Sequence, residues 1–263
     1  AFGQAGAASP PLTAAQATAP AGGSANPNNA RGRGRGRGRG RRGPAVPQGP
    51  TPHLPNGHVD LQGVWQGGGP VGDIAQGLPK GEKIPFLPAA KKVMDSRLSK
   101  NDPEANCLPT GVPRQSPYPW RILQSPTHIY FLFEGNIHSY RQIFMTGEHP
   151  KDPDPTWYGD SRAHWDGDTL VVDTVGYNDK FWFDFKGTPH TEQLHTIERY
   201  TRKNLGTLEN QITIDDPGDY SRPWTVTFTA RLRPKEELME YICQENQQDT
   251  QHIEGLAGAP GNP

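Results

Sequence analysis

The chain has 263 residues, 32% of them hydrophobic, and a formal net charge of −1. No run approaches the roughly 20 apolar residues of a membrane-spanning helix, so we expect a soluble protein without a membrane span. Seven arginines lie before residue 43, and the rest of the chain carries 20 basic against 28 acidic residues. An acidic body is a poor electrostatic partner for nucleic acid, which makes that partner an unlikely one for the folded part.

The first 50 residues contain no Asp, Glu, Lys, Trp or Tyr, and residues 31–42 read RGRGRGRGRGRR. Such a segment cannot bury a hydrophobic core. We therefore predict a disordered tail over residues 1–50, a single folded domain over 51–246 and a flexible C-terminal tail over 247–263. Arg-Gly runs can bind RNA, but without an aromatic RNA-binding motif elsewhere the run favours a linker or a tether to an anionic surface.

The Ala-rich start without an initiator Met is the pattern of a mature exported protein whose signal peptide has been removed. A sequence that begins at some other point of a longer protein would show the same start. We expect export, to the periplasm or the extracellular space.

The foldable part opens with Asp60–Trp65, in which Gly63-x-Trp65 is typical of a first strand of lipocalin-like barrels, where the indole closes one end. Residues Pro88–Lys100 predict a short amphipathic helix with Pro at its start, and Asn101-Asp102-Pro103 ends it. An extended, proline-punctuated segment follows as far as Pro119.

The clearest β-hairpin spans Trp157–Tyr177, where two runs of alternating side chains flank Asp166-Gly167-Asp168. The same pattern predicts strands at Leu61–Trp65, Trp120–Gln124, His128–Glu134, His138–Met145, Ser161–Asp166, Thr169–Tyr177, His195–Lys203, Thr207–Ile214, Trp224–Arg231 and Leu238–Glu245. The connections are mostly short and none provides a βαβ crossover. We predict an all-β fold, an antiparallel up-and-down (lipocalin-like) β-barrel of about 8–10 strands, in preference to a sandwich.

The two cysteines, Cys107 and Cys243, show no zinc-ligand spacing. In an exported protein they would most simply form one disulfide that ties the segment before the barrel to the last strand. Two separate buried thiols are the alternative.

Residues 102–246 carry a series of specific short motifs. They are Asp102-Pro103, Cys107-x-Pro109-x-Gly111-x-Pro113-Arg114, Tyr140-Arg141-Gln142-Ile143, Asp154-Pro155-Thr156-Trp157-x-Gly159, Trp165-x-Gly167-Asp168-Thr169-Leu170-Val171-Val172-Asp173-Thr174, Gly187-x-Pro189-His190, Leu194-His195, Glu198-Arg199-Tyr200, Asp215-Asp216-Pro217, Pro223-Trp224 and Glu240-Tyr241-x-Cys243-x-Glu245-Asn246.

In these motifs the chain resembles a widespread family of exported bacterial proteins to which no reaction is assigned. The resemblance covers more than half of the chain and implies an exported location and a lipocalin-like barrel. One departure concerns Thr146-Gly147-Glu148-His149-Pro150, where the family usually has Asp-Gly-Arg before His-Pro. This chain lacks the family's arginine at that place, so no role of that arginine can be transferred to it.

Three charged side chains share a strand face with apolar neighbours, which is unusual for an outward face. Arg141 alternates with Ile143, Glu198 with Tyr200, and Glu240 with Leu238 and Ile242. If these faces point inward, the barrel interior holds Arg141, Glu198 and Glu240. Such a group is either a structural ion pair that fixes the register of the strands or a polar anchor at the base of a ligand cavity.

Histidines and one tryptophan extend the candidate site. His190 and His195, with His149 and His164, could place imidazoles at one barrel mouth for proton transfer, against the alternative of ordinary loop histidines. Trp182, between Phe181 and Phe183, is either a lid over a barrel mouth or a core residue. The spacing favours no metal site, and we expect no cofactor.

Three hypotheses for function follow. The first is an exported barrel that binds a small, partly apolar organic molecule in its lumen, with Arg141, Glu198 and Glu240 as anchors and Tyr200, Trp182 and His195 as further contacts. The alternative is a cofactor-independent isomerase, cyclase or lyase in which Glu198 is the general base and Arg141 or His190 stabilises an oxyanion. The second alternative is a structural or surface-assembly protein. The folded part shows no GxSxG, Walker or GxGxxG spacing.

Overall fold

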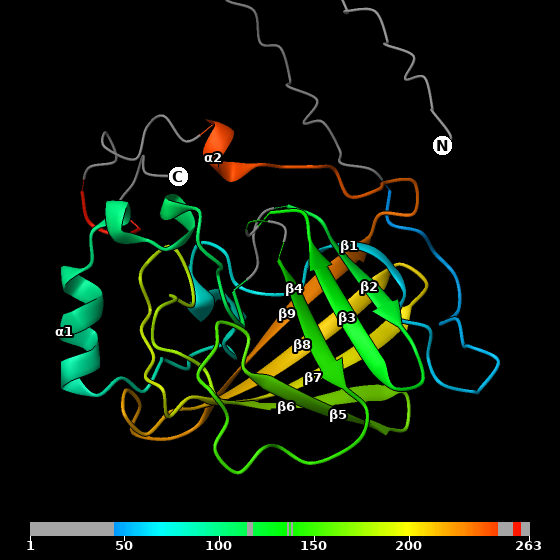
Figure 1. The fold of residues 1–263 in the computed structure, drawn as a ribbon, viewed down its shortest axis with the longest axis horizontal. Coiled ribbons are helices and arrows are strands. Elements are labelled where there is room, and N and C mark those ends of the chain that lie inside the picture. Colours follow the sequence, from blue (N-terminus) through cyan, green and yellow to red (C-terminus); the bar gives the residue numbers. More distant parts are fainter. Residues whose placement is uncertain (1–44, 115–117, 136, 138, 247–254, 259–263) are drawn as a thin grey trace, which may run out of the picture. The chain divides into compact units, whose positions relative to one another are not determined.

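Nine strands close into a barrel in the order of the sequence (Figure 1). A computed structural model describes residues 45–114, 118–135, 137, 139–246 and 255–258. The strands are β1 (Gly63–Gly67), β2 (Trp120–Gln124), β3 (His128–Phe133), β4 (Tyr140–Phe144), β5 (Asp160–Asp166), β6 (Thr169–Val175), β7 (His195–Asn204), β8 (Thr207–Asp215) and β9 (Trp224–Leu232). The predicted all-β barrel is confirmed.

Helical structure is short and lies outside the strands. The predicted helix is present as α1 (Pro88–Ser96), with Pro88 at its first position, and a second helix, α2, spans Cys243–Asn246. Three 3₁₀ turns complete the set: η1 (Ile74–Gly77), η2 (Ser99–Asn101) and η3 (Glu104–Asn106). Within the described ranges, no helix has the length and apolar character needed to cross a membrane.

One junction of the barrel departs from the antiparallel arrangement that we expected. β4 and β5 pair parallel, through Ile143↔Ser161 and Phe144↔Arg162 alone, whereas every other pair of neighbouring strands is antiparallel. The reason is the connection 145–159, which is long enough to return the chain to the end where β4 began. A purely antiparallel, up-and-down topology is therefore not confirmed.

The strand expected at Leu238–Glu245 does not form. Residues 238–242 have no regular structure, and α2 begins at Cys243. The end of β9 already has a strand on each side, because it pairs with β8 and, through Trp65↔Leu232 and Gly67↔Ala230, with β1, so the chain that follows cannot pair beside it. The predicted first residue of the fourth strand, His138, lies outside the described residues, as do residues 1–44 of the N-terminal tail and residues 247–254 and 259–263 of the C-terminal tail.

Two hydrophobic clusters fill the fold. The first lies within the barrel and contains the fully buried Trp65, Trp120 and Phe131. The second is formed by β8, β9 and the segment after β6, and includes Phe181, Phe183 and Trp224. Successive side chains of a strand point to opposite faces, so every second residue of β7 points into the barrel. Its first eight residues are accordingly buried and partly exposed in strict alternation.

The segment before β1 is fixed at one end of the barrel. The Gln124 side chain accepts from the Leu61 N–H at 3.0 Å and donates to the Val59 carbonyl at 3.1 Å. The Arg202 guanidinium donates to the Asp60 carbonyl and lies 5.0 Å from the centre of the Trp65 ring. This segment therefore forms part of the barrel end.

Cys107 and Cys243 form a disulfide, as expected, with a Cα–Cα distance of 5.7 Å. It joins the residue after η3 to the first residue of α2, so the bond does not reach a strand.

We predict that replacing both cysteines by serine lowers the free energy of unfolding by about 3–5 kcal/mol. The bond closes a loop across a sequence separation of 136 residues, and its loss releases the entropy of the unfolded chain. Urea unfolding of the variant measures the effect, and reduced wild-type protein is the control. A loss below about 1 kcal/mol would contradict the entropic account.

Candidate functional site

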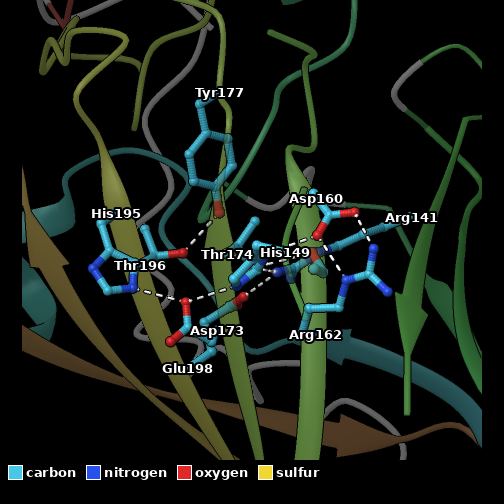
Figure 2. Close-up of polar contacts among 11 residues, drawn as sticks. Arg141, His149, Asp160, Arg162, Asp173, Thr174, Tyr177, His195, Thr196 and Glu198 are labelled. Carbon is cyan, nitrogen blue, oxygen red and sulfur yellow. Dashed lines mark hydrogen bonds and ion pairs between the residues drawn. The ribbon is translucent and has the colours of Figure 1, made fainter. Parts of the chain in front are cut away.

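The barrel interior holds one ion pair between distant strands. Arg141 of β4 and Glu198 of β7 are 2% and 1% exposed, and Arg141 Nη2 lies 2.6 Å from Glu198 Oε2. Both side chains point inward because they alternate with outward residues along their strands. The pair therefore spans β5 and β6, which lie between these two strands in the barrel (Figure 2).

Hydroxyl groups of the intervening strands accept hydrogen bonds from the arginine. Arg141 Nε donates to Ser161 Oγ at 3.1 Å and Nη2 donates to Thr174 Oγ1 at 2.9 Å, and the two hydroxyls lie 3.0 Å apart. Burial alone would lower the pKa of Arg141, but the Glu198 carboxylate outweighs it and holds that pKa above its usual value. The guanidinium is a permanent cation inside the barrel.

The carboxylate has its own partners. Tyr200 Oη donates to Glu198 Oε1 at 2.7 Å, and Asn210 Nδ2 lies 3.4 Å from the same oxygen. Burial, reinforced by the Glu198 charge, raises the pKa of Tyr200 well above its usual value, so the phenol remains a donor. Arg141, Glu198 and Tyr200 are thus the three predicted site residues that the fold brings together.

The other predicted residues lie elsewhere. Glu240 is exposed in the irregular segment before α2 and does not enter the barrel, because the strand expected there is absent. Trp182 is 5% exposed, with the Arg97 guanidinium 4.8 Å from its ring centre. It is a packed residue of the loop 176–194, next to the second hydrophobic cluster.

His190 is also buried, and it is enclosed by aromatic rings. Its ring centre lies 3.9 Å from that of Phe181 and 5.0 Å from that of Phe183. Nδ1 lies 3.2 Å from the Thr191 carbonyl. Burial lowers the pKa of His190 to about 4. The expected group of four histidines at one barrel mouth does not form.

Two of those histidines instead meet on the outer wall of the barrel (Figure 2). His149 Nδ1 lies 2.7 Å from Asp160 Oδ1, and His149 Nε2 lies 3.2 Å from Asp173 Oδ1. His195 Nε2 approaches the same Asp173 oxygen at 2.8 Å. Asp160, His149, Asp173 and His195 therefore form a continuous chain of carboxylates and imidazoles across β5, β6 and β7.

The charges around this outer chain affect the pKa of one of its carboxyl groups and the orientation of one of its imidazole rings. Burial would raise the pKa of Asp160, but hydrogen bonds from Arg162 and His149 outweigh it and the pKa is lowered. The bond between Asp173 and His195 Nε2 orients that ring and directs Nδ1 away from the carboxylate, which is the arrangement of a carboxylate-held base. Within the described ranges, no group of three or more His, Cys, Asp or Glu side chains is arranged to hold a metal ion.

A groove of about 680 Å³ lies at the end of the barrel where the segment before β1 meets the β2–β3 hairpin and β5. Its apolar lining comes from Leu54, Pro55, Ile129, Met145 and Trp165. Met145 and Trp165 also pack against the first hydrophobic cluster, so the groove lies directly above the barrel core. The fourth predicted histidine, His164, lines this groove.

The fold and site define a closed β-barrel with a charged pair inside and a separate groove at one end. Comparison of the chain with protein-family models, curated proteins and solved structures gave no match. Membership of the exported family stays a prediction.

Sequence reasoning missed two parts of this arrangement. The first is Asp173, whose outward position beside apolar inward residues on β6 follows from alternation. The groove had no such signal, because its lining comes from four segments that are far apart in the sequence.

We predict that Glu198→Gln lowers the free energy of unfolding by about 3–5 kcal/mol, because it leaves the Arg141 charge buried without its carboxylate. The double variant Arg141→Met, Glu198→Met should be more stable than this single variant, since it removes both charges. Urea unfolding of the two variants and the wild type tests this. A single-variant loss below about 1 kcal/mol would show that the pair is not needed.

We also predict a pH dependence that originates in His190. Its pKa is about 4 in the folded protein against 6.5 normally, so between these values only the unfolded chain takes up the proton. The contribution of neutral His190 to the free energy of unfolding is therefore complete above pH 6.5 and is lost as the pH falls toward 4. From pH 7 to pH 4 the wild type should lose about 3 kcal/mol more than His190→Phe. Equal losses in urea unfolding at the two pH values would contradict this origin.

Proposed function

We propose that this protein is an exported binding protein that takes a small, partly apolar organic molecule into the groove at the end of its barrel. The observation that carries the proposal is the groove itself. Its volume of about 680 Å³ lies within the range of roughly 300–1,000 Å³ that is usual for small-molecule sites.

The chemistry of the lining supports an amphipathic ligand. The apolar lining is joined by the polar side chains of Asn56, His58, Gln124, Ser125 and His164. His58 stacks on Trp165 with ring centres 4.9 Å apart, which presents a flat aromatic wall. A mainly apolar lining with few polar groups is the usual composition of a site that binds by shape and orients by hydrogen bonds.

This proposal moves the binding site away from the charged pair. Arg141 and Glu198 already satisfy each other and the surrounding hydroxyls, so they support a structural role better than that of ligand anchors. The same contacts weigh against Glu198 as a general base, because Arg141 and Tyr200 occupy both of its oxygens. The packed interior agrees with a structural protein, but a purely structural role does not explain the groove.

The finer fold and location belong to the same proposal. We propose a lipocalin-like relation and an exported location, periplasmic or extracellular. The disulfide supports export, because such bonds persist mainly in oxidising compartments. The resemblance of residues 102–246 to exported bacterial proteins is the second support.

The test is ligand-induced stabilisation of the full chain against a panel of phenolic, terpenoid and fatty-acid molecules. A ligand at a hundredfold excess over its Kd should add about 2.7 kcal/mol to the free energy of unfolding. Met145→Trp should abolish the effect, because the larger side chain fills the groove above Ile129. Val93→Trp, on the exposed face of α1, is the matched control and should respond like the wild type. Stabilisation that persists in Met145→Trp would place the ligand elsewhere.

A further inference from the structure

Strand β5 has a partly unpaired edge. β4 contacts β5 only through Ile143↔Ser161 and Phe144↔Arg162, and β4 ends at Phe144. β5 continues to Asp166, paired with β6 along its whole length. Within the described part of the chain, residues 163–166 therefore have a strand on one side only.

The hairpin geometry identifies which backbone groups face the free side. β5 and β6 are joined by the two-residue turn Gly167-Asp168, and Asp166 pairs with Thr169. The residues that flank a two-residue turn form a hydrogen-bonded pair, and the direction of the backbone groups alternates along the strand. The C=O group of Ala163 and the N–H and C=O groups of Trp165 consequently point toward the free edge, whereas the parallel pair Phe144↔Arg162 places the Ala163 N–H against the Phe144 carbonyl.

The chain after β4 leaves this edge open. The Met145 N–H donates to the Thr127 carbonyl at 3.0 Å, and the Thr146 carbonyl accepts from Arg162 Nη1 at 3.2 Å. Further along, His149 binds Asp160 and Asp173 on the outer wall. The connection thus crosses the outer face of β5 instead of running beside it.

The open edge and the groove coincide. His164 and Trp165 of β5 line the groove together with Met145 and with Ile129 of β3, which is 1% exposed. Unpaired backbone groups in one plane, beside an apolar pocket for alternate side chains, are the recognition elements for an added strand. A ligand without amide groups would use the pocket and leave the backbone groups to water.

We propose that the ligand of this groove is a short extended peptide, which adds a strand to β5 at residues 163–166. The inference rests on the proposed function and specifies its ligand class. One peptide side chain would enter the apolar pocket over Ile129 and Met145, while its neighbours point to solvent. The occupant is short because only residues 163–166 of β5 extend beyond the pairing with β4.

The experiment measures binding of blocked tetrapeptides with one central leucine, valine or phenylalanine to the full chain by calorimetry. Each peptide is compared with two analogues that are N-methylated on alternate amides. Only one of the two registers faces β5, so one analogue should bind at least tenfold more weakly and the other should bind like the parent. Equal affinity of all three would overturn strand addition.

Amide hydrogen exchange gives a second readout that needs no variant. Peptide binding should slow exchange at Trp165 and leave Ala163, already paired with β4, and His164, already paired with β6, unchanged. Met145→Trp should abolish peptide binding, and Val93→Trp should not. Binding without protection at Trp165, or binding that survives Met145→Trp, would contradict the inference.

The outcomes separate this inference from the proposed function. If apolar molecules without amides bind in the groove and peptides do not, the groove remains a ligand site and strand addition is wrong. If neither class binds, both proposals fail. If peptides bind with the expected register dependence, both are supported.

Discussion

The ion pair between Arg141 and Glu198 crosses the junction of β4 and β5 on the inner side of the barrel, where the backbone pairing is shortest. That junction has two residue pairs, whereas β7 and β8 are paired over nearly their whole length. Arg141 crosses this junction from the inside, since its guanidinium binds Ser161 on β5, Thr174 on β6 and Glu198 on β7. A buried charge must be paired, and the partners of this one connect four neighbouring strands.

The same junction is held from the outside by the connection 145–159. His149 and Arg162 converge on Asp160, and His149 also reaches Asp173. Both sets of contacts act at the beginning of β5, where β4 is still alongside. Neither the inner nor the outer set of contacts extends beyond Phe144, and the groove opens there. Closure at one end and the cavity at the other therefore follow from one parallel pairing.

Alternation and turn chemistry predicted much of the fold. The hairpin around Asp166-Gly167-Asp168 forms as expected, and inward positions were assigned correctly for Arg141, Glu198 and Tyr200. The parallel junction was not predictable, because the pattern of a strand does not state its direction. The position predicted for Glu240 was wrong for a related reason: its segment alternates like a strand, but the end of β9, which precedes it, already has a strand on each side. His190 lies among aromatic rings that only the tertiary fold assembles.

The disulfide has a consequence for the integrity of the molecule. Cys107 precedes β2 and Cys243 follows β9, so eight of the nine strands lie inside one covalent ring. A protease that cuts a single surface turn within this ring, such as Gly167-Asp168, would leave the two pieces joined. A nicked molecule in an oxidising compartment would keep its strands together as one particle until the bond is reduced.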